Sequence, residues 1–203
     1  METAKDALKI GIMGGTFNPV HYGHLRAAEE ARERLSLEKV IFIPAGNPPH
    51  KSENLAPAED RYNMTLLAIQ DCPYFSVSRI ETDRQDKSYT FETLETLKKN
   101  PEYTKAELYF ITGFDAVLDI INWKSPEAIA ALCRIAAVSR PGYTQDKISS
   151  LPENIRRTVI PLEMPLLEIS GTELRRRIID GKSIKYLVPP SVEKYIVEKG
   201  LYV

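Results

Sequence analysis

The sequence alternates short apolar segments with longer segments of helical pattern, and this alternation restricts the fold more than any other feature. The apolar segments are nearly continuous rather than alternately polar, as expected for strands that are covered on both faces. Strands and helices in alternation favour parallel strand pairs joined by right-handed crossovers. We therefore expect an α/β fold: an open parallel sheet of about five to six strands with helices on both faces and a small C-terminal helical part.

The expected elements follow from this pattern. Strands are predicted at residues 9–13, 39–44, 74–78, 107–112 and 133–139, with a short sixth at 157–161. Helices are predicted at residues 23–35, 58–70, 91–99 and 114–132, the last broken near Pro126, and then at 172–180 and 191–199. Residues 47–57 and 141–153 are predicted to be loops, and one domain is expected over residues 1–203, with a tail at 1–8 and the C-terminal helical portion at 165–203. In such a sheet ligands bind beyond the carboxyl ends of the strands, so the site is expected in the segments that follow them.

Composition and charge exclude several classes of protein. The apolar share of 43% and the charged share of 27% are typical of a soluble globular chain. The sequence has neither an apolar stretch near the ~18 residues of a membrane helix nor a signal-peptide core, so we expect a cytoplasmic protein with no membrane partner. A formal net charge of −1 argues against a nucleic-acid partner, although it can hide a small cationic pocket. Cys72 and Cys133 are expected to be reduced core residues, and no metal site is expected.

The segment GGTFNPVHYGHL, residues 14–25, directly follows the first expected strand. Its glycines match neither the dinucleotide nor the Walker spacing. Glycines nevertheless let a backbone approach a phosphate, and a helix that opens near Tyr22 offers unpaired N–H groups to an anion. His21 and His24 are two of the three histidines in the chain and fall on one face of that first turn, with Gly23 between them. The segment therefore predicts a site for a bound phosphate group.

This segment resembles the H-x-G-H element of the nucleotidyltransferase superfamily, and in this form it is most similar to the bacterial nicotinate-nucleotide adenylyltransferase family. Further motifs that resemble the family's follow in the same order: NPPHK (47–51), SYTFETL (88–94), FITGFDAV (110–117) with NWKSPEAI (122–129), VSRPGY (138–143) and ISGTELRRRI (169–178). The resemblance covers most of the chain. It implies a Rossmann-like fold and an enzyme of NAD biosynthesis that joins nicotinate mononucleotide and ATP into nicotinate adenine dinucleotide and pyrophosphate. It also implies direct in-line attack without a covalent intermediate, with Mg²⁺ held mainly by the phosphates of ATP.

The resemblance also implies the roles of individual residues. The expected catalytic residues are His21, His24 and Arg175. The residues expected to bind ATP are Gly14, Gly15, Thr16, Phe17, His21, His24, Gly113, Asp115, Ile169, Ser170, Thr172 and Arg175. The residues expected to bind nicotinate mononucleotide are Asn18, His50, Lys51, Tyr89, Thr90, Trp123 and Arg140. All three histidines, together with Lys51, Arg140 and Arg175, are expected to form a cationic pocket within an overall acidic molecule.

Several of these residues have a structural alternative. Ser170 and Glu173 fit a capping box, which would explain both without a ligand. Arg175 favours the interpretation that this segment binds an anionic ligand. A cation in a first helical turn is unfavourable with respect to the helix dipole by ~0.3–1 kcal/mol unless an anion is bound there. Thr90 could cap a helix, Trp123 could be plain core, and Asp115 could be an N-cap or a ribose ligand. Gly171 departs from the family, which usually has serine at this position.

Two other functions stay open. One is another small nucleotidyltransferase, for example one that acts on phosphopantetheine. The second is a non-catalytic nucleotide-binding or regulatory module, which would have no need for His21, His24 and Arg175 together. Neither the preference for nicotinate over nicotinamide mononucleotide nor the formation of a homo-oligomer is settled by the sequence.

Overall fold

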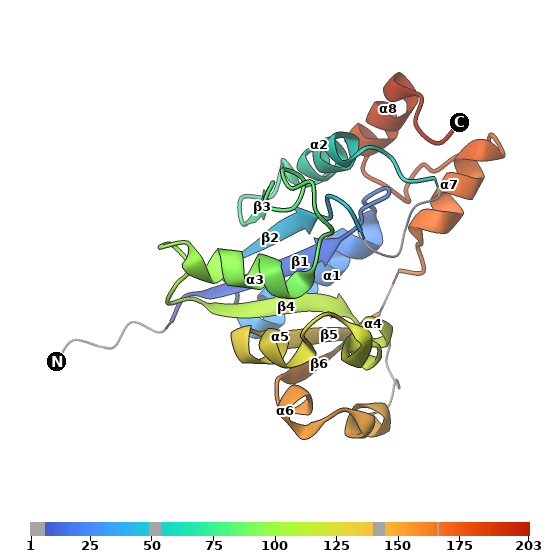
Figure 1. Cartoon of the computed structure of the whole chain (residues 1–203). Helices are drawn as coiled ribbons and strands as arrows, with labels where there is room; N and C mark the ends of the chain where they lie inside the picture. The colour runs from blue at the N-terminus through green and yellow to red at the C-terminus, as the bar shows by residue number, and fades with distance from the viewer. Residues whose placement is uncertain (1–6, 49–53, 140–144, 166) are drawn as a thin grey trace.

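The computed structural model describes residues 7–48, 54–139, 145–165 and 167–203. Six strands within these ranges form one sheet in the order β3-β2-β1-β4-β5-β6, and every neighbouring pair is parallel (Figure 1). The strands are β1 (Lys9–Gly15), β2 (Lys39–Pro44), β3 (Phe75–Val77), β4 (Glu107–Gly113), β5 (Arg134–Ser139) and β6 (Val159–Glu163). The predicted open, parallel, Rossmann-like sheet is confirmed.

Helices cover both faces of the sheet, as predicted. Figure 1 shows α3 and α5 in front of the sheet and α1 behind it. The helices whose buried residues pack on the α1 face are α1 (Tyr22–Leu35), α2 (Ala58–Ile69), α7 (Gly171–Ile179) and α8 (Pro190–Lys199). Those on the opposite face are α3 (Thr90–Lys99), α4 (Phe114–Leu118), α5 (Pro126–Leu132) and α6 (Glu153–Arg156), with the 3₁₀ turns η1 (Ile120–Asn122) and η2 (Gln145–Ser150). None of the helices in the described ranges has the length and apolar character that a membrane-crossing segment requires.

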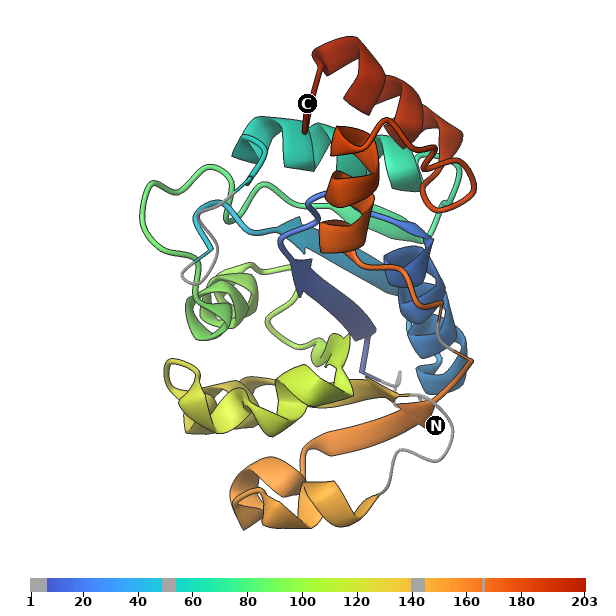
Figure 2. The same cartoon turned by 90° about the vertical axis from the view of Figure 1, so that its right-hand side faces the viewer.

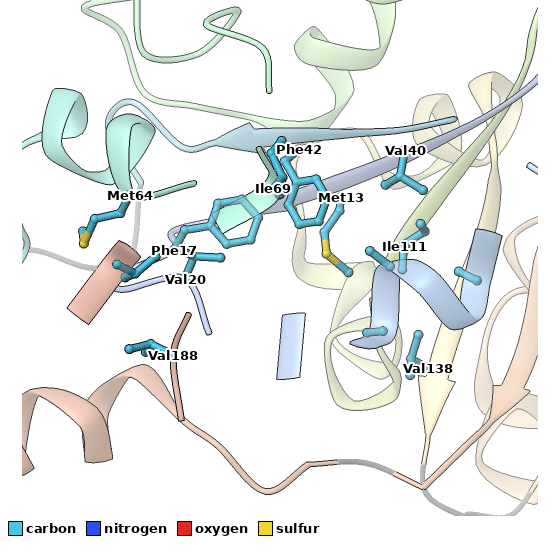
Figure 3. Packing of buried hydrophobic residues seen from close by; sticks show 14 of the residues in the cluster. Met13, Phe17, Val20, Val40, Phe42, Met64, Ile69, Ile111, Val138 and Val188 are labelled. Carbon is cyan, nitrogen blue, oxygen red and sulfur yellow. The ribbon is translucent and has the colours of Figure 1, made fainter. Parts of the chain in front are cut away.

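The sheet separates two hydrophobic clusters. Successive side chains of a strand point to opposite faces, so Ile10 and Ile12 of β1 enter the cluster under α3, whereas Met13 enters the cluster under α1. Figure 3 shows the cluster on the α1 face of the sheet, in which Met13 and Phe42 lie near Phe17 and Val20 from the turn after β1. The ring of Phe17 is only 2% exposed. The side chain of Phe17, in the middle of the turn after β1, therefore anchors this turn in the core.

The order of the strands indicates where on the sheet a ligand-binding crevice is expected. The chain runs outward from β1 through β2 to β3 and then returns to β4 on the other side of β1. The direction of winding thus reverses between β1 and β4, and a crevice opens at such a point beyond the carboxyl ends of the strands. Figure 2 views the molecule from the side toward which the strands point, with α7 lying beside the end of β1.

Three predictions of element bounds need correction. The break predicted near Pro126 in the helix over 114–132 is confirmed, because α5 begins at Pro126 after Ser125, whose φ is +55°. The part before the break is α4 and the turn η1 rather than one helix. The strand predicted at 157–161 is β6, two residues later, because α6 and its C-cap extend to Arg157. The loop predicted at 141–153 contains η2, whose six residues are too few for a visible period. Both cysteines are free thiols; Cys133 is buried as expected, whereas Cys72 is only half-buried, so the prediction that it is a core residue is wrong. The predicted division into one domain, a tail and a C-terminal portion stays a prediction.

Candidate active site

The turn after β1 brings the two histidines together at the start of α1. His21 is the N-cap residue, with extended backbone (φ −150°, ψ 169°), and the helix begins at Tyr22, as predicted. The backbone N–H of His21 donates to Nδ1 of His24 at 3.3 Å. The two imidazole rings stack with centroids 3.7 Å apart and planes inclined by 26°. Because Nδ1 of His24 accepts this bond, the neutral ring carries its proton on Nε2.

Packing explains why residue 23 is a glycine, which the sequence alone did not show. A Cβ atom at this position would lie 3.0 Å from Nδ1 and 3.1 Å from Cε1 of His21. The glycine therefore makes room for the His21 ring. Phe17 supports the other imidazole, because its ring meets that of His24 edge-on, with centroids 5.0 Å apart. Since the Phe17 ring belongs to the core, the contact with ATP predicted for this residue would fall to its backbone.

His21 is buried, with only 5% of its surface exposed. Burial lowers the pKa of its imidazole from 6.5 to about 4, so the ring is neutral at neutral pH. The Nδ1 atom of His21 is buried, and the His21 side chain faces the backbone N–H of His24 in a reciprocal capping box. The expected contribution of His21 to a cationic pocket is therefore corrected: in the ligand-free protein this residue supplies polar atoms and no charge.

The lowered pKa of His21 makes the stability of the ligand-free protein depend on pH. The unfolded chain binds the proton first, so folding stability is complete above pH 6.5 and falls as the pH decreases toward 4. The 2.5-unit difference between the two pKa values corresponds to a loss of about 3 kcal/mol below pH 4. Urea unfolding from pH 7 to pH 4 measures this loss, and His21→Asn should reduce it. Identical pH profiles for the two proteins would contradict the assignment.

Arg175 reaches the same turn from α7. Its Nη1 donates to the carbonyl oxygen of Asn18 at 2.8 Å, although the two residues are 157 positions apart. The next two arginines point elsewhere: Arg176 pairs with Glu173 at 2.9 Å and Arg177 donates to the carbonyl of Ser183 at 2.9 Å. Of three consecutive guanidinium groups, the one predicted from the sequence is the one that contacts the turn after β1.

The start of α7 confirms the structural alternative for Ser170. Its hydroxyl accepts the N–H of Glu173 at 3.2 Å and caps the helix. Gly171 follows, and a Cβ atom there would lie 2.8 Å from the carbonyl oxygen of Asn18. A serine at this position would push against the carbonyl that Arg175 holds. The structure thus explains the departure from the family pattern by the close approach of α7 to the turn.

Asn18 lies at the centre of this contact. Its side chain is buried, donates to the carbonyl of Asn54 at 2.9 Å, and accepts from the N–H of Ala56 at 3.1 Å and from the hydroxyl of Tyr202 at 2.7 Å. These bonds hold the turn after β1 against two distant segments. The predicted contact between Asn18 and the mononucleotide stays a prediction.

A cavity of about 420 Å³ lies at the reversal point of the sheet. The expected site residues that line it are Gly14, Gly15, Thr16, Thr90 and Trp123. A neighbouring cavity of about 540 Å³ shares Thr90 and Trp123 with it and adds Tyr89. Trp123 is half-buried and meets the Phe110 ring edge-on, with centroids 6.0 Å apart. It is therefore a wall of both cavities rather than a plain core residue.

The remaining expected residues line neither cavity or lie outside the described part of the chain. Gly113 and Asp115 are exposed at the start of α4, where Gly113 is the N-cap, so Asp115 is not the N-cap. Thr90 likewise is the first residue of α3, and Tyr89 is its N-cap. Ile169 and Thr172 flank the start of α7, and Thr172 accepts a bond of 3.4 Å from Arg175. His50, Lys51 and Arg140 lie outside the described residues.

Five polar residues that line the cavity were not predicted as site residues: Glu81, Ser88, Thr93, Thr112 and Asp119. Arg61 was not predicted either, and its guanidinium donates to the carbonyl of Thr16, which is part of the cavity lining. A signal for Arg61 was present, because this arginine falls on the same face of α2 as the buried Met64 and Thr65. A basic residue on the apolar face of a helix needs polar partners inside the protein.

The fold and the site together define a nucleotidyltransferase, and the profile of the cytidylyltransferase-like family matches residues 12–177. Two curated relatives, from Moorella thermoacetica and Thermus thermophilus, are each 46% identical over 96% of this chain and over 91% and 100% of their own lengths. Both carry the name "Probable nicotinate-nucleotide adenylyltransferase". The chain belongs to the nicotinate-nucleotide adenylyltransferase family.

A solved structure shares the fold. Nicotinic acid mononucleotide adenylyltransferase of Plasmodium falciparum, in complex with NaAD, superposes with a TM-score of 0.77 at 21% identity. The superposition covers 96% of this chain and 97% of that one.

Proposed function

We propose that this chain transfers the adenylyl group of ATP to nicotinate mononucleotide and releases pyrophosphate, a step of NAD biosynthesis. The observation that carries the proposal is the hydrogen bond from Arg175 to the Asn18 carbonyl. It brings a guanidinium group to the turn that holds His21 and His24. A guanidinium and two imidazoles at a helix N-terminus are suited to a polyphosphate.

The reaction needs alignment more than proton transfer. A phosphate oxygen of the mononucleotide attacks the α-phosphorus of ATP, the bond from that phosphorus to the bridging oxygen breaks, and pyrophosphate leaves with the electron pair. The attacking oxygen is already ionised, so no general base is required. His24 and Arg175 would stabilise the charge that develops on the transferring group and on the leaving pyrophosphate. His21 would hold the His24 ring in place through their stacked contact.

The nicotinate end fits the two adjoining cavities. Trp123 and Tyr89 offer flat aromatic faces to a pyridine ring, and Thr90 lies between them at the start of α3. The backbone N–H groups at the start of this helix are suited to an anion such as a carboxylate. This supports the acid form of the mononucleotide as the substrate.

We further propose that Mg²⁺ enters with ATP as part of the substrate. Among the described residues, no three carboxylate, imidazole or thiol side chains gather into a metal site. The site offers ring nitrogens and a guanidinium, which match phosphate oxygens better than a hard cation, and Mg²⁺ keeps most of its ligands as phosphates and water. The proposed partners of the protein are two small phosphorylated molecules, ATP and nicotinate mononucleotide. Its proposed location is the cytoplasm.

The function is tested by pyrophosphate release from MgATP with each of three acceptors. We expect release with nicotinate mononucleotide and little with nicotinamide mononucleotide or phosphopantetheine. Release with phosphopantetheine alone would favour the other small transferase. ATP binding without release with any acceptor would favour a regulatory module.

Trp123→Ala tests the assignment of the nicotinate cavity. Loss of a stacking face should raise KM for the mononucleotide about tenfold, because an aromatic pair contributes about 0.5–1.5 kcal/mol beyond its buried area. KM for ATP should stay within about twofold of the unchanged protein. Tyr186→Ala is a matched control, since that ring is 82% exposed. A selective loss of ATP affinity in Trp123→Ala would show that the two substrates occupy the reverse positions.

A further inference from the structure

Arg61 is the largest side chain that is fully buried in the described part of the protein. It lies on the inward face of α2, and its guanidinium donates three hydrogen bonds of 2.9 Å each. Nε donates to the carbonyl of Ala56, Nη1 to that of Thr16 and Nη2 to that of Gly46. None of the described carboxylates forms an ion pair with it. All three of its hydrogen bonds go to neutral carbonyls, and the Glu81 carboxyl attracts it without forming an ion pair. Burying a cation in this way is costly, so its position calls for a reason other than stability.

The three carbonyls belong to segments that the chain separates. Thr16 lies in the turn after β1 and lines the cavity. Gly46 lies just after β2, next to Ala45, which also lines the cavity. Ala56 precedes α2, and its N–H binds the side chain of Asn18. One guanidinium therefore sets the spacing between the phosphate-side turn and the segment after β2.

The network continues from Gly46 toward the nicotinate side. The N–H groups of Gly46 and Asn47 donate to the hydroxyl of Ser88 at 3.1 and 3.3 Å. Ser88 is also joined to Asn47 through its own N–H at 3.0 Å, and it precedes Tyr89 and Thr90 in the second cavity. A continuous chain of hydrogen bonds thus runs from Thr16 to the wall that would hold the pyridine ring.

We propose that Arg61 is a positioning residue that fixes the distance between the two substrate half-sites. The proposal rests on the proposed function, because an in-line attack between two bound molecules is sensitive to their mutual placement. A displacement of about 1 Å can cost about 10²-fold in rate while each molecule still binds. The signature expected for Arg61 is therefore a fall in kcat with little change in either KM.

The test compares Arg61→Met and Arg61→Lys with Met64→Ala. Met64 is buried on the same face of α2, and removing its side chain weakens the packing of this helix without removing a partner from Thr16 or Gly46. Arg61→Lys keeps the positive charge but not the planar fork, so it cannot hold three carbonyls together. All rates are divided by the folded fraction measured by circular dichroism.

For Arg61→Met we expect kcat to fall about 10²-fold, with both KM values within about threefold of the unchanged protein. Arg61→Lys should lose at least about tenfold, and Met64→Ala should stay within about threefold of the unchanged protein at a similar loss of stability. Near-normal kcat in folded Arg61→Lys or an equal fall in Met64→Ala would overturn the proposal.

A second measurement separates this proposal from the proposed function. Trp123 is the only tryptophan of the chain and lines the cavity, so its emission and its quenching by acrylamide report the cavity without turnover. Both should change in folded Arg61→Met and Arg61→Lys and not in Met64→Ala. Unchanged tryptophan signals in both Arg61 variants would overturn the positioning role. Changed tryptophan signals in the Arg61 variants, together with no pyrophosphate release from the unsubstituted protein, would overturn the proposed function alone.

Discussion

Replacing His24 by alanine should lower kcat by ~10²–10³-fold, the scale for loss of one preorganised hydrogen-bond donor. The ring stands on the first turn of α1, with Nδ1 occupied by the His21 backbone N–H and Nε2 carrying the proton. It is therefore oriented before any substrate arrives. The measurement is steady-state pyrophosphate release at saturating MgATP and mononucleotide, with folding followed by circular dichroism.

Folding should survive this change, because the His24 ring is only half-buried and contacts the rings of His21 and Phe17. Arg26→Ala is a suitable control on the same helix, since Arg26 is exposed and pairs with Glu30. The Arg26→Ala substitution removes an exposed cation from the same helix but leaves the hydrogen-bond donors of the turn after β1 in place. Turnover of folded His24→Ala within about threefold of this control would refute the role of the imidazole.

Among the glycines in the described ranges, Gly46 is the one at which a change to alanine should lower the stability of the protein most. The added Cβ atom would lie 2.1 Å from the carbonyl oxygen of Glu81, 2.8 Å from its carbonyl carbon and 3.3 Å from Cα of Thr82. These are backbone atoms, so no side chain can turn away, and one of the two segments must move. We expect a loss of about 3 kcal/mol in the free energy of unfolding. The thermal midpoint should then fall by about 6–12 °C for a chain of this size.

The same substitution should reduce activity in the protein that remains folded. Moving Gly46 pulls its carbonyl from Arg61 and its N–H from Ser88, which are the two links across the cavity. Gly113→Ala is the control for stability, because a Cβ atom there meets nothing within 4 Å. An unfolding midpoint for Gly46→Ala equal to that of Gly113→Ala would show that the Glu81 segment moves without cost.

The sequence predicted the parts of the site that depend on local order. The sheet followed from apolar segments in alternation with helices, and the turn after β1 followed from glycines and histidines at fixed spacing. Arg175 could be singled out because a cation at a helix start conflicts with the helix dipole. Each of these arguments uses only residues that are close in the sequence.

The features of the site that the sequence did not predict depend on contacts between segments that are distant in the chain. Nothing near Gly171 in the sequence shows that the carbonyl of Asn18 lies 2.8 Å from its missing Cβ atom. The neutral state of His21 follows from burial, which the spacing of two histidines does not report. The position of Arg61 on the apolar face of α2 indicates that it needs polar partners, but the three carbonyls that bind it belong to segments that only the fold brings together.

The hydrogen bond from Tyr202 to Asn18 has a consequence for the order of assembly. It closes a loop of 184 residues, which at equilibrium costs little more than a loop half as long. Contacts between such distant partners form slowly, however, because most of the chain must be ordered first. During synthesis the first helix can therefore form long before the turn that precedes it is locked, and competence for catalysis arrives as one of the last events of folding.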